Sequence, residues 1–74
     1  MTRTLNEIKA ALSGGQYSKA VVHHHGAVLG WFRGSVDLDD VFSLISNETA
    51  RGTLTVQLDD KGFIVKDGKV VHFV

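Results

Sequence analysis

The sequence contains no cysteine and no proline, and its aromatic residues are limited to one Trp, one Tyr and four Phe. Without cysteine, no disulfide supports the fold and no thiol nucleophile is present. No apolar run approaches the roughly 20 residues that cross a bilayer, and the chain does not open with a signal-peptide pattern. The length of 74 residues fits one compact domain. We therefore expect one domain over residues 1–74, soluble and in the cytoplasm of the producing or host cell.

Net charge is also absent, because eight basic residues balance eight acidic ones. A neutral chain has no strong electrostatic attraction to nucleic acid or to an anionic membrane. It also has little colloidal repulsion, which favours self-association. A domain this small buries roughly 60% of the surface that its unfolded chain exposes, so oligomerisation is one route to adequate stability.

What the sequence does contain is turn signals between β-rich segments. Asp67-Gly68 is typical of a two-residue type I′ turn, which needs positive φ at both positions. A two-residue turn fixes the register of the last hairpin. The predicted pairs are Lys66–Lys69, Val65–Val70, Ile64–Val71 and Phe63–His72. A four-residue loop over 59–62 then joins this hairpin to the strand 53–58, pairing Leu58 with Phe63.

Side chains alternate between the two faces of a sheet, so this register predicts two distinct surfaces. The expected core face carries Leu54, Val56, Leu58, Phe63, Val65, Val70, His72 and Val74. The opposite face carries Thr53, Thr55, Gln57, Ile64, Val71 and Phe73. Its three apolar residues are unusual for a solvated surface. They indicate cover by a helix, or by a second copy or partner, and the pattern favours neither.

Residues 19–25 and 27–32 predict a second hairpin with a turn at His25-Gly26. The expected pairs are His24–Ala27, His23–Val28, Val22–Leu29, Val21–Gly30 and Ala20–Trp31. Both faces of this hairpin are mostly apolar, which is typical of a central or sandwiched position in a sheet.

Two helices complete the pattern. Thr4 and Glu7 form a capping box at the start of the first helix, which ends before Gly14-Gly15 with Gly14 as a left-handed C′ residue. Asp37 is the expected N-cap of the second, which ends near Asn47. The buried stripe of this helix comprises Leu38, Val41, Phe42, Leu44 and Ile45. The predicted order α-β-β-α-β-β-β gives an α+β domain with an antiparallel sheet and two short helices.

The histidines are the first candidates for chemistry. On a strand, His23 and His25 point to one face, about 7 Å apart. A third ligand such as His72 or an aspartate would be needed to hold Zn²⁺. Structural zinc sites have four well-spaced Cys or His ligands, and that pattern is missing. We predict neither a metal site nor a cofactor.

A catalytic site is the second candidate. Ser18 or Ser35, a histidine and Asp37 supply the residue types of a hydrolytic triad, but a triad is defined by geometry. The cluster Asp37, Asp39 and Asp40 is explained by N-capping and by the helix dipole. No phosphate-binding loop or nucleophile elbow is present. We therefore predict that the protein is not an enzyme.

Two binding functions remain. Lys61, Lys66 and Lys69 gather near the last hairpin, and Trp31, Phe32 and Arg33 combine stacking surfaces with a cation. This combination is typical of single-strand binders, although Asp59, Asp60 and Asp67 offset it. The alternative function is therefore weak binding of single-stranded nucleic acid, with Arg33, Lys66 and Lys69 as contacts.

The favoured hypothesis is a protein-binding module that forms a homodimer. The surplus apolar face, the neutral charge and the small size all support it. The predicted contacts are Ile64, Val71 and Phe73, with Trp31 or Phe32 nearby. By size and composition alone, such a chain resembles an accessory or inhibitor protein of a phage or mobile element.

Overall fold

Residues 3–73 fold into two α-helices and one six-stranded antiparallel sheet. The computed structural model describes the backbone of residues 3–73 and the side chains of residues 3–71. The elements are β1 (Arg3–Thr4), α1 (Leu5–Leu12), β2 (Lys19–His24), β3 (Ala27–Arg33), α2 (Leu38–Glu48), the 3₁₀ turn η1 (Thr49–Arg51), β4 (Leu54–Leu58), β5 (Lys61–Lys66) and β6 (Lys69–Phe73). The predicted α+β class and the order α-β-β-α-β-β-β are confirmed.

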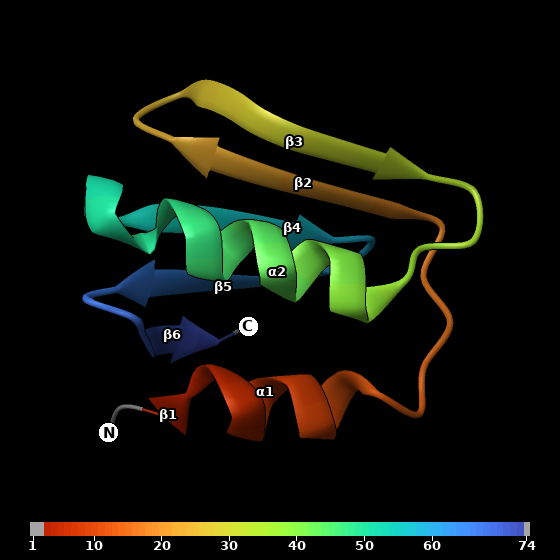
Figure 1. Ribbon diagram of the computed structural model, residues 1–74. Helices are drawn as coiled ribbons and strands as arrows, with labels where there is room; N and C mark the ends of the chain where they lie inside the picture. Colours follow the sequence, from red (N-terminus) through yellow and green to blue (C-terminus); the bar gives the residue numbers. More distant parts are fainter. Residues whose placement is uncertain (1–2, 74) are drawn as a thin grey trace.

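The strands lie in the order β1-β6-β5-β4-β2-β3 across the sheet (Figure 1). Strand β1 is an addition to the predicted order. It pairs Arg3 with Val70 and Thr4 with Lys69, immediately before α1 begins. Two residues are too few to show an alternating pattern, so the sequence does not predict this strand. Strand β3 forms the other edge and pairs on one side only.

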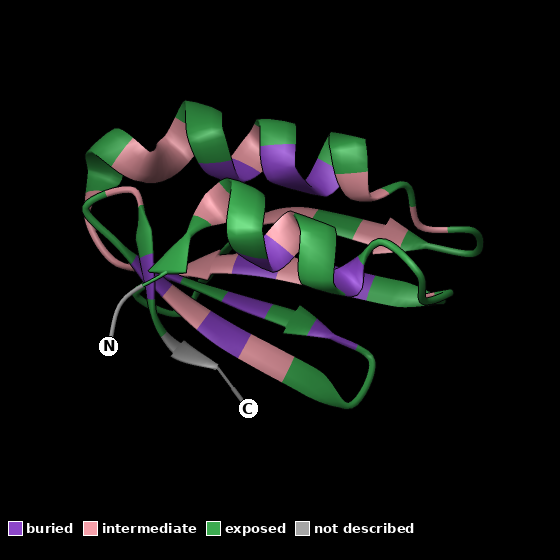
Figure 2. Ribbon diagram, turned by 90° about the horizontal axis from the view of Figure 1, so that it is seen from below, coloured by how far each residue is buried: buried purple, intermediate pink, exposed green. Residues whose placement is uncertain are grey.

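Both helices pack on the same face of the sheet (Figure 2). Ile8 and Leu12 of α1, with Val41, Phe42 and Ile45 of α2, are buried against this face. The sheet contributes Ala20, Val22, Leu54, Val56, Leu58, Phe63, Val65 and Val70. We call this side the covered face and the opposite side the open face. No element in residues 3–73 lies over the open face, so cover by a helix, one of the two predicted explanations, is wrong.

The helix starts follow the sequence signals. Thr4 and Glu7 form the predicted capping box, with Glu7 N donating to Thr4 Oγ1 at 3.1 Å and Thr4 N to Glu7 Oε1 at 3.2 Å. Asp37 caps α2 by accepting a hydrogen bond of 2.9 Å from Asp39 N. The end of α1 differs from the prediction, because Gly14 does not adopt a left-handed conformation. Instead, Ser13 bonds Ala10 O through its N–H and its hydroxyl.

The C-terminal hairpin follows the prediction near its turn and departs from it further away. Asp67 and Gly68 have φ of 54° and 76°, as a type I′ turn requires, and Val65 pairs with Val70. Beyond that point a β-bulge makes Val71 an extra residue. Ile64 therefore pairs with His72, and Phe63 with Phe73. The predicted pairs Ile64–Val71 and Phe63–His72 are wrong for this reason.

The turn between β4 and β5 is shorter than predicted. Leu58 pairs with Lys61 and Val56 with Phe63, so only Asp59 and Asp60 form the loop. The register is shifted by two residues from the predicted one. Because strand side chains alternate with a period of two, this shift leaves every side chain on its predicted face. The predicted core residues from Leu54 to Val70 are accordingly buried, while the side chains of His72 and Val74 lie outside the described part.

A second bulge, at Leu29, changes the β2–β3 hairpin. The pairs His24–Ala27 and His23–Val28 are as predicted, but Val22 pairs with Gly30, Val21 with Trp31 and Ala20 with Phe32. The predicted pairs Val22–Leu29, Val21–Gly30 and Ala20–Trp31 are therefore one residue off. The bulge brings Trp31 to the open face and Phe32 to the covered face. It also places Gly30 under α2, where an added Cβ would lie 2.2 Å from Leu44 Cδ2.

Candidate protein-binding surface

The open face carries large apolar side chains in contact with solvent. Trp31 is 60% exposed and Val28 is 57% exposed. Both belong to the edge strand β3, three residues apart, and the bulge between them lets both point away from the helices. Val71, the extra residue of the β6 bulge, is 39% exposed. An exposed tryptophan beside other apolar groups is typical of a contact surface.

Cross-strand pairing arranges the open face in rows. Trp31 pairs with Val21, Val21 with Gln57, and Gln57 with Gly62, so one row runs from β3 to β5. The adjacent row contains Val28, His23, Thr55 and Ile64. Each row therefore begins with an exposed apolar residue on β3. The first row then crosses Val21 and Gln57, and the second crosses His23 and Thr55, before reaching β5.

Arg33 lies next to the exposed tryptophan. Its guanidinium carbon is 4.7 Å from the centroid of the Trp31 ring, within the range of a cation–π interaction. The two residues stand two positions apart on β3, so they share the open face. Together they form a projection with an aromatic body and a cationic rim.

A shallow hollow lies across the open face from this projection, on β4 and β5. Gly62 has no side chain, and the surrounding surface comes from Thr55, Gln57, Asp60 and Ile64. The Gln57 side chain is fixed beside the hollow because its amide donates to Asp59 O at 3.0 Å. The hollow thus combines an apolar wall, Ile64, with an acidic rim, Asp60.

The neutral sequence conceals a separation of charge between the two layers. The strands and their turns carry six basic and three acidic residues, a balance of plus three. The helices, with the Asp37 cap and η1, carry two basic and five acidic residues, a balance of minus three. Lys19 pairs with Arg33, and Lys66 with Lys69, at opposite ends of the open face. Arg3 and Lys61 pair with the covered-face residues Val70 and Leu58, so four of the six strand cations belong to the open face. The open side is the more basic one by this smaller margin.

The predicted contact residues are distributed unevenly over this surface. Ile64 is half-buried in an open-face row, and Trp31 and Val71 are exposed. Phe32 packs against the buried core instead, because it pairs with Ala20 on the covered face. The side chain of Phe73 lies outside the described part of the chain. Val28 was missed as a surface feature although its pairing with His23 was predicted, because both faces of its hairpin were expected to be covered. Gly62 was missed because it was predicted to lie in the loop over 59–62 and not in a strand.

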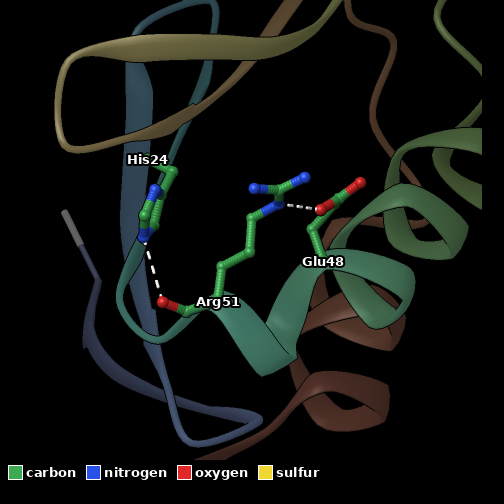
Figure 3. A network of polar contacts seen from close by, with 3 residues as sticks. All are labelled: His24, Glu48 and Arg51. Carbon is green, nitrogen blue, oxygen red and sulfur yellow. Dashed lines mark hydrogen bonds and ion pairs between the residues drawn. The ribbon is translucent and has the colours of Figure 1, made fainter.

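The histidines have separate surroundings. His24 Nε2 donates to the carbonyl oxygen of Arg51 at 3.0 Å, and the Arg51 side chain forms an ion pair with Glu48 (Figure 3). These contacts connect the end of β2 to η1. His25 has a φ of 50° in the turn and packs edge-on against the His24 ring. Over the described residues, no group of three or more His, Cys, Asp or Glu side chains is placed to hold a metal ion.

The residues considered for a triad do not converge. The Ser18 hydroxyl donates to Asp59 Oδ1 at 3.0 Å, and the backbone N–H groups of Ser18 and Lys19 also donate to this carboxylate, each at 3.1 Å. These hydrogen bonds hold the pKa of Asp59 below its ordinary value, and the bond from Ser18 N has the largest effect. His23 is five residues further along β2, roughly 16 Å away. Ser18 and Asp59 therefore form a clamp that ties the β4–β5 turn to the start of β2.

Comparisons with protein-family models, with curated proteins and with solved structures find no match. None of the helices in the described range is both long and apolar enough to cross a membrane.

Proposed function

We propose that this protein is a non-enzymatic protein-binding module that acts through its open face and self-associates as a homodimer. The observation that carries the proposal is the position of Trp31, a large aromatic side chain that is 60% exposed on a sheet face without an overlying element in residues 3–73. Tryptophan is strongly enriched among residues that dominate binding energy at interfaces.

Further support comes from the neighbours of Trp31. Val28 and Ile64 extend the apolar area along the next row, and the edge strand β3 pairs on one side only. Ser18 and Asp37, which were considered for a catalytic triad, have structural hydrogen-bond partners. Ser18 and Asp59 bind each other, and Asp37 caps α2.

The test compares one charge placed on either face. Ile64→Asp should abolish association, because it buries an unpaired charge in the contact. Ser43→Asp, on the exposed side of α2, adds the same charge and should leave association intact. Mass in solution by light scattering and capture of proteins by the immobilised chain provide the readouts, and circular dichroism checks the fold. Association that survives Ile64→Asp in a folded protein contradicts the proposal.

A second candidate is weak binding of single-stranded nucleic acid on the same face. The observation that favours it is the Trp31–Arg33 pair on the more basic side of the molecule, with Lys66 and Lys69 at the opposite end. Stacking platforms flanked by cations bind single strands without sequence preference. Retention on immobilised single strands that falls steeply with salt supports this candidate, and no retention at low salt eliminates it.

We further propose that the protein is an accessory or inhibitor protein of a phage or mobile element, which acts in the cytoplasm of the producing or host cell. This proposal is supported by the small size and the composition without cysteine. A protein of this kind acts by occupying a surface on another protein, so the open face is the part that its partner should contact.

A further inference from the structure

The open face is complementary to itself, because it carries both a projection and a hollow that could receive the same projection from a second copy. The Trp31–Arg33 projection lies on β3, and the Gly62–Asp60 hollow lies on β5. Strands β2 and β4 separate them, so the projection and the hollow are about 14 Å apart at the usual strand spacing. Trp31 and Gly62 end the same cross-strand row. They are therefore level with each other along the strands.

Arg33 of the projection and Asp60 of the hollow are also level with each other along the strands. Arg33 pairs with Lys19, and Asp59 N donates to Lys19 O at 3.2 Å, which places the Asp59-Asp60 turn at the end of the Arg33 row. Arg33 follows Trp31 by two residues, and Asp60 precedes Gly62 by two residues. Because β3 and β5 run in opposite directions, both steps lead the same way along the sheet.

We infer that two copies of this chain pack open face to open face about a two-fold axis parallel to the strands, between β2 and β4. This inference rests on the proposed function and specifies its partner. Such an axis places β3 of one copy over β5 of the other, and it leaves the position of each residue along the strand direction unchanged. Trp31 of each copy then enters the Gly62 hollow of its partner, and Arg33 lies over the partner's Asp60. In the adjacent row, Val28 lies over the partner's Ile64.

The charge pattern favours this occupant over an unrelated one. The two cationic residues at the Trp31 end, Lys19 and Arg33, meet the acidic Asp59-Asp60 turn of the other copy. Lys66 comes to lie over the His25-Gly26 turn, which contains neither Lys nor Arg, so two lysine or arginine side chains do not oppose each other there. A right-handed sheet twist is preserved by a two-fold axis along the strands, so the two sheets keep an even separation of about 10 Å.

The available area indicates which class of interface the dimer belongs to. About this axis four strands oppose their counterparts, namely β5, β4, β2 and β3, and at standard strand spacing they cover roughly 19 Å by 20 Å. Burying this area on both copies removes on the order of 800 Å² of surface, below the roughly 1,000 Å² of a stable specific interface. We therefore expect a weak dimer that dissociates on dilution.

The first experiment fills the hollow. Gly62 does not have a positive φ, so a side chain is allowed by the backbone there, and the close neighbour that must shift is the end of the Gln57 side chain, 3.2 Å from the new Cβ. Gly62→Val should keep the monomer folded and weaken dimerisation by about a hundredfold, because Trp31 loses its receptor and an overpacked contact is strained. Sedimentation velocity over a concentration series measures the effect. Ser43→Val, on the exposed side of α2, is the matched control.

The second experiment exchanges charges and does not depend on packing. Arg33→Asp and Asp60→Arg should each weaken the homodimer by about tenfold or more, because like charges then face each other. An equimolar mixture of the two variants should form a heterodimer close to wild-type strength. The double variant Arg33→Asp with Asp60→Arg should likewise recover, since each reversed charge meets a reversed partner.

The outcomes separate this inference from the proposed function. A wild-type monomer at high micromolar concentration overturns the inference and the homodimer part of the proposed function. The protein-binding part survives if Ile64→Asp still abolishes binding of a foreign protein. The inference is also overturned if Gly62→Val dimerises as strongly as the wild type, or if the mixture of the two charge variants does not form a heterodimer. Loss with Gly62→Val together with rescue by charge exchange supports it.

Discussion

The two faces of the sheet are built from the same strands and have different surroundings. Along β5, Phe63 and Val65 are buried beneath the helices, while Ile64 between them is half-buried on the open face. Along β4, Val56 is buried and its neighbours Thr55 and Gln57 are exposed. The covered face explains why the chain folds. The open face, with its exposed tryptophan and its hollow, supports a binding function.

The largest expected difference between the faces is found on neighbouring residues of β5. Phe63→Ala should cost about 3–5 kcal/mol of unfolding free energy, because it leaves a cavity beside Phe42, whose ring is stacked 5.9 Å away. Ile64→Ala should cost about 1 kcal/mol, since its side chain is only partly buried. Urea unfolding of both variants at low protein concentration measures the contrast. Equal losses would show that the open face is as buried as the covered one.

Two glycines sharpen the comparison further. Gly30→Ala should destabilise by about 1 kcal/mol, because the new Cβ would lie 2.2 Å from Leu44 Cδ2 and this side chain would have to leave its place over Gly30. Gly62→Ala would place a Cβ 3.2 Å from Gln57 Oε1 and 3.5 Å from Val56 O, so only the Gln57 side chain must shift, and the stability of the monomer should change by less than about 0.5 kcal/mol. Thermal unfolding of the dilute proteins distinguishes them. A tolerated alanine at position 30 would show that the Leu44 side chain is not held over Gly30.

A smaller effect is expected where the covered layer begins. Thr4→Ala should cost about 1 kcal/mol, because it removes the hydroxyl that accepts from Glu7 N at the start of α1. Asn6→Ala, an exposed change within the same turn, is the control and should be nearly neutral. Denaturant midpoints of the two variants provide the measurement. A larger loss at Asn6 than at Thr4 would show that the capping box does not hold this helix.

The smallest effect concerns the clamp beside the open-face hollow. The hydrogen bonds from Ser18 and Lys19 hold the pKa of Asp59 below its ordinary value, so this carboxylate stabilises the fold when it is ionised. That contribution is complete above the ordinary pKa of about 3.9 and is lost as pH falls through the lower folded-state value. The effect is small because the site is exposed to solvent.

Asp59→Asn tests this effect and keeps a side chain that tolerates the left-handed backbone at φ 48°. The variant should show a flatter decline of stability below pH 4 than the wild type. Asp67→Asn, at the neighbouring turn with a φ of 54°, is the control. An unchanged acid profile for Asp59→Asn would show that its hydrogen bonds do not favour the ionised form.

The sequence predicted the parts of the fold that depend on local chemistry. The caps at Thr4 and Asp37, the Asp67-Gly68 turn and the alternation from Leu54 to Leu58 are all as expected. The two bulges were not predictable, because an extra residue such as Leu29 or Val71 has no sequence signature. The bulge at Leu29 is the one that moves Trp31 from its expected position opposite Ala20 to the open face. The candidate surface was therefore identified by composition, while its geometry required the structure.

The most direct measurement of the central claim uses Trp31, the only tryptophan in the chain, as a reporter on the open face. Its emission and its quenching by iodide would be followed over a dilution series, together with the mass from light scattering. We predict that Trp31 is quenched freely in the dilute monomer and becomes protected over the concentration range in which the mass doubles. A doubled mass with Trp31 still fully quenched would contradict the account, because the contact would then lie elsewhere.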